Sequence, residues 1–308
     1  MHVKILGSAA GGGFPQWNCA CSNCRLVRSG TFSGKARSQT QVAISHDGLS
    51  WFLLGASPDL RSQIEACPDL QARDGANTSP LCGVVLASAD LDHVLGLLLL
   101  RELQPLNVYA TASVIHILRE QNSMFGMLNR TPDQVRWQAI SPGESFQLCA
   151  PSGKQSGITC TSISIPTRYP VYVSDSDPDL NPEDAALALI VTSDSGRVLV
   201  YAPTVAAVTQ SLRKWVERAD LLLFDGTFYG DDELIRVRGS GQRARDMGHL
   251  PVGGEDGSLR QLARLRVPRK LYIHINNTNP ILNQTSPEYR NVREAGWELA
   301  EDGWQATL

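Results

Sequence analysis

The chain alternates short apolar β runs with helical stretches in both of its halves, and this alternation restricts the possible folds more than any other sequence feature. The first half predicts strands at residues 3–6, 41–44, 51–54, 81–87 and 108–110, and helices at 59–66, 92–103 and 112–121. The second half predicts strands at 158–165, 186–192, 198–201, 221–224 and 270–275, and a helix at 205–218. We therefore expect an α/β fold with two sheets face to face and helices outside, a four-layer αβ/βα sandwich formed by one domain over residues 1–308.

Acidic residues and a histidine follow the longest apolar strand of the first half. After residues 81–87 come Ser88, Asp90, Asp92 and His93. Asp92 begins the next expected helix, where the helix dipole favours a carboxylate. Asp225 closes a second apolar strand, and burying a carboxylate there without a partner would be costly. Both positions are candidates for a metal or catalytic site.

Three of the seven cysteines lie close together, as Cys19, Cys21 and Cys24. Neighbours so close in sequence are poorly placed to pair with one another in disulfides, whereas three thiolates on one tight loop supply most of a tetrahedral zinc shell. We expect a structural zinc loop at residues 19–24, with a fourth ligand from elsewhere in the chain. The remaining four cysteines are expected to be small core side chains.

Charge and hydropathy exclude several classes of protein. The chain has 28 Lys and Arg against 31 Asp and Glu, a formal charge of −3, so nucleic acid is not expected as a main partner. No stretch approaches the roughly 18 to 20 apolar residues of a membrane span. The start of the chain has too short an apolar run for a signal peptide, so we expect a cytoplasmic location.

The motifs in combination resemble the coenzyme PQQ synthesis protein B family, the metallo-β-lactamase-like member of pyrroloquinoline quinone (PQQ) biosynthesis. The resemblance rests on the glycine-rich segment 7–18, the three cysteines, the altered Asp-His motif and the late segment 273–280, which reads Ile-His-Ile-Asn-Asn-Thr-Asn-Pro. It covers the chain from end to end. It implies a metallo-β-lactamase-like fold.

The resemblance also implies which metal ligands remain. The superfamily motif is His-x-His-x-Asp-His, so Ser88 and Asp90 stand where the first metal site has two histidines. Residues 166–168, Pro-Thr-Arg, stand where its third histidine is expected. The second site matches Asp92, His93 and His274, with Asp225 as the bridging carboxylate.

Further roles follow from the same resemblance. His249 resembles a superfamily histidine that often touches substrate near the metals. In phosphodiesterase relatives a histidine completes the zinc loop at the position that Asn277 holds here, so Asn277, a water or another residue is expected to do so. His2, His46 and His116 have no carboxylate motif around them and are expected to be structural or exposed.

Two histidines and one carboxylate that bind one metal form the facial triad of ligands found in non-haem iron(II) enzymes. His93, His274 and Asp92 provide it, with Asp225 and Asp90 as further ligands or a proton relay and with His249 and Asp90 as candidate catalytic residues. The resemblance implies an iron-dependent oxygenase that hydroxylates the tyrosine ring of a glutamate-tyrosine intermediate cut from a precursor peptide. Zinc is expected to compete for this site.

Two alternatives stay open at this point. The protein could carry PQQ or its precursor towards the periplasm, or it could be a mononuclear metal-dependent hydrolase. The expected partners are a small peptide-derived substrate or PQQ, and other proteins of the PQQ pathway; a homodimer is also left open. Two long connections, residues 166–183 and 226–257, are expected to be site walls or mobile loops. Their Arg168, Arg243 and Arg245 could bind substrate carboxylates or be exposed without partners.

Overall fold

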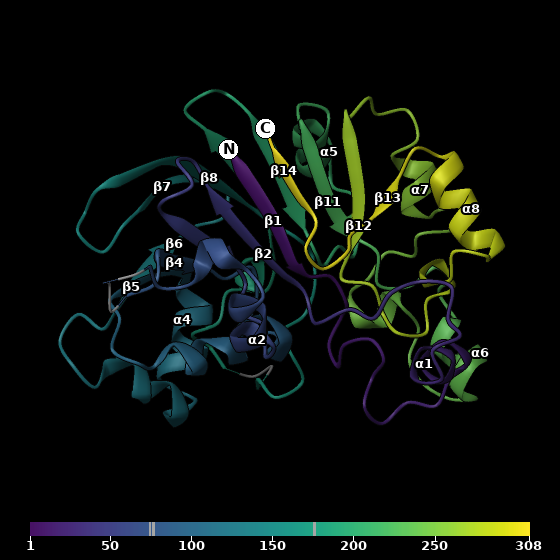
Figure 1. The fold of residues 1–308 in the computed structure, drawn as a ribbon, viewed down its shortest axis with the longest axis horizontal. Coiled ribbons are helices and arrows are strands. Elements are labelled where there is room, and N and C mark those ends of the chain that lie inside the picture. The colour runs from purple at the N-terminus through teal and green to yellow at the C-terminus, as the bar shows by residue number, and fades with distance from the viewer. Residues whose placement is uncertain (74, 76–77, 175–176) are drawn as a thin grey trace.

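The computed structural model describes residues 1–73, 75, 78–174 and 177–308, which form two seven-stranded sheets packed face to face (Figure 1). In the first sheet the strand order is β14-β1-β2-β3-β4-β5-β6. Its strands from β14 to β3 pair antiparallel, and those from β3 to β6 pair parallel. They are β1 His2–Gly7, β2 Gln41–Ser45, β3 Trp51–Leu54, β4 Leu81–Val85, β5 Leu106–Thr111, β6 Val135–Ile140 and β14 Gln305–Thr307.

The second sheet has the order β13-β12-β11-β10-β9-β8-β7. Here the strands from β13 to β10 are parallel, and those from β10 to β7 are antiparallel. Its strands are β7 Ser145–Cys149, β8 Gln155–Ser164, β9 Leu187–Ser193, β10 Val198–Ala202, β11 Leu221–Asp225, β12 Arg269–Ile273 and β13 Glu298–Leu299.

Three separate hydrophobic clusters show the layers. The middle cluster lies between the sheets and includes Phe52 and Leu223. One outer cluster lies between the first sheet and the helices α2 (Leu60–Glu65) and α4 (Ala112–Arg119). The other lies between the second sheet and the helices α5 (Gln210–Val216) and α8 (Pro287–Glu294). Three cores between layers require four layers, so the predicted αβ/βα sandwich is confirmed.

The helices connect the strands or cover the outer faces of the sheets. The α-helices are α1 Ser22–Arg28, α2 Leu60–Glu65, α3 Leu91–Val94, α4 Ala112–Arg119, α5 Gln210–Val216, α6 Glu233–Arg238, α7 Ser258–Gln261 and α8 Pro287–Glu294. Short 3₁₀ helices are η1 Pro68–Leu70, η2 Leu95–Leu100, η3 Ser123–Asn129, η4 Pro182–Asp184, η5 Arg245–Met247 and η6 Pro280–Leu282. Within the described part of the chain, no helix combines the length and hydropathy that crossing a membrane requires.

Two predicted helices are wrong in their extent. The helix expected at 92–103 is divided into α3 and η2. Near the division, Gly96 N–H donates to the Ala56 carbonyl oxygen. The backbone of Ser57 also lies so close that a Cβ on Gly96 would be 2.2 Å from the Ser57 carbonyl oxygen. The helix expected at 205–218 begins only at Gln210, because the Thr209 side chain caps it and Val205 N–H instead donates to Asp225.

The long connections also differ from the expectation. Residues 226–257 contain α6 and η5. Residues 166–183 include Asp175 and Ser176, which lie outside the described residues, so this segment can be followed only in part.

Candidate metal centre

The candidate ligands gather where strands of both sheets end. Asp92 and His93 lie in α3, shortly after β4, and Asp225 is the last residue of β11. His274 follows β12, whose last residue pairs with Asp225 across the parallel ladder. The carboxyl ends of parallel strands lie at one edge of a sheet. At this edge Asp92 and His274, which are 182 residues apart in sequence, lie side by side.

Hydrogen bonds join these side chains closely. His274 Nε2 lies 2.9 Å from Asp92 Oδ2, and His249 Nδ1 lies 2.8 Å from Asp225 Oδ2. The His274 ring stacks with the ring of His93 and with that of His249, at a centroid distance of 5.4 Å in each pair. Two overlapping groups can therefore hold a metal, Asp92 with His93 and His274, and Asp225 with His249 and His274.

The burial of His93 fits a metal ligand. Its side chain is almost fully buried, yet neither Nδ1 nor Nε2 has a hydrogen-bond partner among the described residues. An unpaired buried polar group costs free energy, and coordination of a cation by a ring nitrogen would remove this cost. The donor set, imidazole nitrogens with carboxylate oxygens, suits iron(II) or zinc.

The electrostatics of the centre favour ionised carboxylates. Burial would raise the pKa of Asp92, but the neighbouring His93 and His274 hold that pKa below its usual range. Asp225 is also buried, and His249 lowers its pKa. Burial lowers the pKa of His93 and so keeps its ring neutral. At His274 the hydrogen bond to Asp92 outweighs the effect of burial and raises the pKa. Two buried carboxylates therefore stay negative, as a divalent cation requires.

The residues that replace the first-site ligands pair with one another or with the backbone. Ser88 Oγ donates to Asp90 Oδ2 at 2.7 Å, and neither ion-binding group includes Asp90. A Cβ on Gly248 would lie 2.5 Å from Thr167 Oγ1, so Thr167 contacts the loop that carries His249. Tyr172 OH donates to the Ala89 carbonyl and covers the same region. A role of Asp90 as ligand or proton relay stays a prediction.

His249 lies among the candidate ligands rather than at a distance from them. Its side chain is 12% exposed and it bonds Asp225 directly. The sequence suggested a catalytic histidine that touches substrate near the metals, but it gave no sign of the direct contact with Asp225.

Thr227 is a component of the centre that the sequence interpretation missed. Its hydroxyl contacts both Asp225 and His274. The available signal was its position two residues after a strand-ending carboxylate, which is too common a pattern to identify a site.

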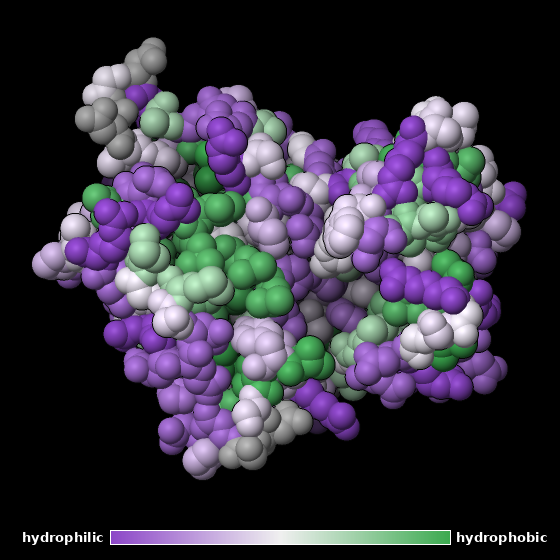
Figure 2. Space-filling view, turned by 90° about the horizontal axis from the view of Figure 1, so that it is seen from below, coloured by the Kyte–Doolittle hydropathy of each residue, from purple (hydrophilic) through white to green (hydrophobic). Residues whose placement is uncertain are grey.

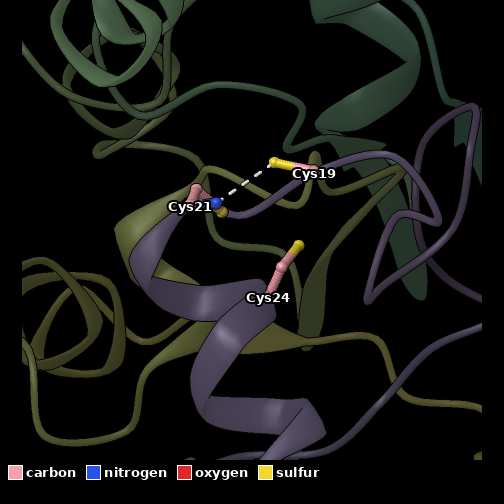
Figure 3. A group of neighbouring side chains, drawn as sticks. All are labelled: Cys19, Cys21 and Cys24. Carbon is pink, nitrogen blue, oxygen red and sulfur yellow. Dashed lines mark hydrogen bonds between the residues drawn. The ribbon is translucent and has the colours of Figure 1, made fainter.

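The three cysteines form a second group. Cys19, Cys21 and Cys24 point towards one another from the start of α1 and the loop before it (Figure 3). Burial raises the pKa of the Cys21 thiol to about 11, whereas hydrogen bonds, chiefly from the Cys21 backbone N–H, outweigh burial at Cys19 and lower its pKa.

Asn277 closes this group from the other side. Its Nδ2 lies 3.1 Å from Cys19 Sγ, 3.3 Å from Cys24 Sγ and 3.6 Å from Cys21 Sγ, while its Oδ1 is buried with no partner among the described residues. Amide nitrogen and oxygen exchange places by a half-turn of the side chain, so Oδ1 can take the fourth position of a tetrahedral zinc shell.

The edge that carries the candidate centre faces down in Figure 1. Seen from below, the surface is hollowed between its left and right parts, and hydrophobic side chains gather on the left part (Figure 2). Leu91, next to Asp92, is half exposed, and Val171 is fully exposed. Arg243 pairs with Asp231 at 3.3 Å, and Arg245 lines a separate cavity of about 570 Å³ beside α6.

Known proteins share this architecture. The family described as "Beta-lactamase superfamily domain" matches residues 50–275. The chain is 42% identical over 303 residues to coenzyme PQQ synthesis protein B of Methylorubrum populi, covering 98% of both chains, and 40% identical to the protein of that name from Gluconacetobacter diazotrophicus, covering 100% of this chain and 99% of the other.

Solved structures agree with these relatives. The crystal structure of Zn²⁺-bound PqqB from Methylobacterium extorquens superposes with a TM-score of 0.92 at 40% identity, over the whole of both chains. A diphosphatase of the PhnP family, at 17% identity with a TM-score of 0.67 over 100% of this chain and 97% of its own, shares the fold. The chain therefore belongs to the coenzyme PQQ synthesis protein B family of the metallo-β-lactamase superfamily.

Proposed function

We propose that this protein acts in PQQ biosynthesis as a mononuclear iron(II) oxygenase that hydroxylates the tyrosine ring of a glutamate-tyrosine intermediate. One observation carries the proposal. Asp92, His93 and His274 form a compact set of two imidazoles and one carboxylate, while Ser88, Asp90 and the segment around Thr167 stand where a second metal would need histidines.

These three residues would hold the metal on one face and leave its other positions open. Iron(II) bound in this way supplies binding and activation of dioxygen. Hydrolytic relatives in the superfamily use two metals, and the loss of first-site histidines removes that arrangement.

The remaining side chains can handle protons. His249 Nδ1–H donates to the Asp225 carboxylate, since an ionised carboxylate only accepts. In its neutral form the ring then has a lone pair on Nε2, which would accept the proton that a substrate ring carbon loses as an oxygen atom is added there. The new hydroxyl oxygen would take up a proton in turn, and the second atom of dioxygen would leave as water with two electrons from a reductant such as ascorbate. Asp225 would stabilise the imidazolium so formed, and Asp90, bonded to Ser88, is a second proton acceptor near the same region.

The test is turnover by defined metal forms. The protein is loaded without oxygen with iron(II) or with zinc and mixed with a glutamate-tyrosine dipeptide and with ascorbate as the reductant. It is then exposed to oxygen, and the products are analysed by mass spectrometry. We expect oxygen insertion only with iron. It should fall by at least about 100-fold in His93→Ala and His274→Ala, since changes to outer partners of a metal ligand already cost about 10–100-fold.

His2→Ala is the matched control, because this histidine lies in β1 outside the centre, and it should retain activity. Cleavage of the peptide by the zinc form without oxygen would favour the hydrolase instead. An unchanged peptide combined with tight binding of PQQ would favour the carrier.

A further inference from the structure

Thr227 occupies the centre of the hydrogen-bond network behind the candidate ligands. It is 3% exposed and follows β11 after Asp225 and Gly226. Its hydroxyl oxygen lies 2.6 Å from Asp225 Oδ1, 2.8 Å from His274 Nδ1 and 2.9 Å from the His274 carbonyl oxygen. One hydroxyl therefore contacts two candidate ligands that come from different strands.

The number of protons fixes the direction of these bonds. A hydroxyl has one hydrogen to donate, and both the Asp225 carboxylate and the His274 carbonyl oxygen can only accept. The shortest contact is to the charged Asp225, so the hydrogen goes there. The hydroxyl oxygen must then accept a hydrogen from His274 Nδ1. Without a metal, His274 Nε2 also carries a hydrogen and donates to Asp92 Oδ2 at 2.9 Å; a metal bound beside Asp92 would take the place of that hydrogen, while Nδ1 keeps its own.

Thr227 is itself held rigidly. Its carbonyl oxygen accepts from Asn276 N–H at 3.1 Å and from Asn279 Nδ2 at 3.2 Å, and its own N–H donates to Asp225 Oδ1 at 3.0 Å. A side chain whose backbone is fixed at both ends can hold a neighbouring ring in one orientation.

We infer that Thr227 is a positioning residue that keeps the proton of His274 on Nδ1, so that Nε2 is presented to the metal beside Asp92. Metal-binding histidines generally donate their second ring N–H to an oxygen of the protein, which fixes the tautomer and the ring orientation. The inference rests on the proposed metal centre, and it is independent of the oxygen chemistry.

Metal affinity tests this role without turnover. The probe is iron(II) alone, titrated without oxygen against a coloured chelator. Thr227→Val keeps the side-chain shape and removes the hydroxyl, and we expect iron affinity to fall by about 10–100-fold. Thr227→Ser keeps the hydroxyl and should remain within about threefold of the wild type, since the hydrogen bond is preserved. A Thr227→Val protein that binds iron as the wild type does would overturn the inference.

Thr111→Val is the matched control. Thr111 is also fully buried, accepts from Val114 N–H and donates to the Asp184 carbonyl, but lies at the start of α4 outside the centre. We expect this variant to lose thermal stability and to keep its iron affinity. An equal loss of affinity in both variants would show that general destabilisation is the cause.

A second measurement needs no variant, in case Thr227→Val does not fold. In zinc-loaded wild-type protein, nitrogen NMR of the His274 ring should show the proton on Nδ1, and a proton on Nε2 would contradict the inference. Normal iron binding without ring hydroxylation in the wild type would remove the proposed function and leave this role of Thr227 intact.

Discussion

His274 adopts a backbone conformation that a non-glycine residue rarely occupies. Its φ is 58°, in the left-handed region, which costs about 1–3 kcal/mol. Ile275 N–H donates to the Ser8 carbonyl and Asn276 N–H to the Thr227 carbonyl, so the chain beyond His274 is held firmly. The turn ends β12 and directs the imidazole towards Asp92. The sequence predicted a strand through residue 275, because an apolar pattern contains no signal for this change of direction.

Glu233 gives a prediction at the residue scale. It is 5% exposed, accepts from Tyr229 N–H and Thr278 Oγ1, and borders the cavity beside α6. Burial raises its pKa from 4.5 to about 7. The folded protein then binds this proton more tightly than the unfolded chain, so this residue's contribution to stability is present below pH 4.5 and is lost as the pH rises to about 7.

Glu233→Gln removes this titration and keeps an acceptor for one of the two hydrogen bonds. We expect its melting temperature to vary less between pH 5 and pH 7.5 than that of the wild type, measured by calorimetry. Glu294→Gln, at an exposed position of α8, is the control and should keep the wild-type profile. Parallel curves for wild type and Glu233→Gln would show that Glu233 is already ionised in the folded protein.

At the scale of elements, the turn from Asn276 to Asn279 connects the cysteine group to the candidate centre. Asn277 contacts the three sulfurs, and Asn23 of α1 donates to the carbonyls of Asn277 and Asn279. Asn279 Nδ2 in turn donates to the carbonyls of Gly226 and Thr227. The cysteine group is thus joined by hydrogen bonds to the segment that carries Asp225 and Thr227.

Cys21→Ser tests this connection. We expect loss of zinc from the cysteine group and a lower melting temperature, because binding free energy at a structural zinc site contributes to folding. Hydroxylation should fall as a second effect, as the turn from Asn276 to Asn279 loosens. The readouts are metal analysis and calorimetry. Cys149→Ser, outside both groups, is the control. Unchanged zinc content and melting temperature in Cys21→Ser would refute a structural zinc here.

The elements that escaped prediction have weak patterns. The edge strands β13 and β14 have two and three residues, too few to show a period. Helix α8 buries only Val292, so it has almost no apolar stripe. Helix α1 begins within the cysteine segment, which the sequence analysis interpreted only as a metal-binding loop. In contrast, the buried strands β2, β3, β4 and β11 were predicted, because nearly every residue in them is apolar.

At the scale of the whole molecule, the candidate centre depends on both sheets. The first sheet contributes Asp92 and His93 after β4, and the second contributes Asp225 and His274 from β11 and β12. The sequence could suggest these four, since each follows an apolar strand in a motif that resembles a known family. The bond between His249 and Asp225 and the role of Thr227 could not be predicted, because both depend on how loops return to the same edge.

Residues other than histidine stand at the positions where the superfamily motif has its first-site histidines. Ser88 and Asp90 pair with each other, and Thr167 packs on the loop before His249. The described chain thus offers imidazoles at one metal position and small polar side chains at the other. We propose that this asymmetry serves oxygen chemistry on an aromatic ring.

The source of the new oxygen atom on the ring, dioxygen or water, tests this proposal directly. Iron(II)-loaded protein would react with a glutamate-tyrosine dipeptide under isotopically labelled oxygen gas in ordinary water, with mass spectrometry of the ring. We predict that the label enters the tyrosine ring. Heavy label found only when the water is labelled, or a dipeptide that is cleaved without gaining oxygen on its ring, would contradict an oxygenase and point to hydrolysis.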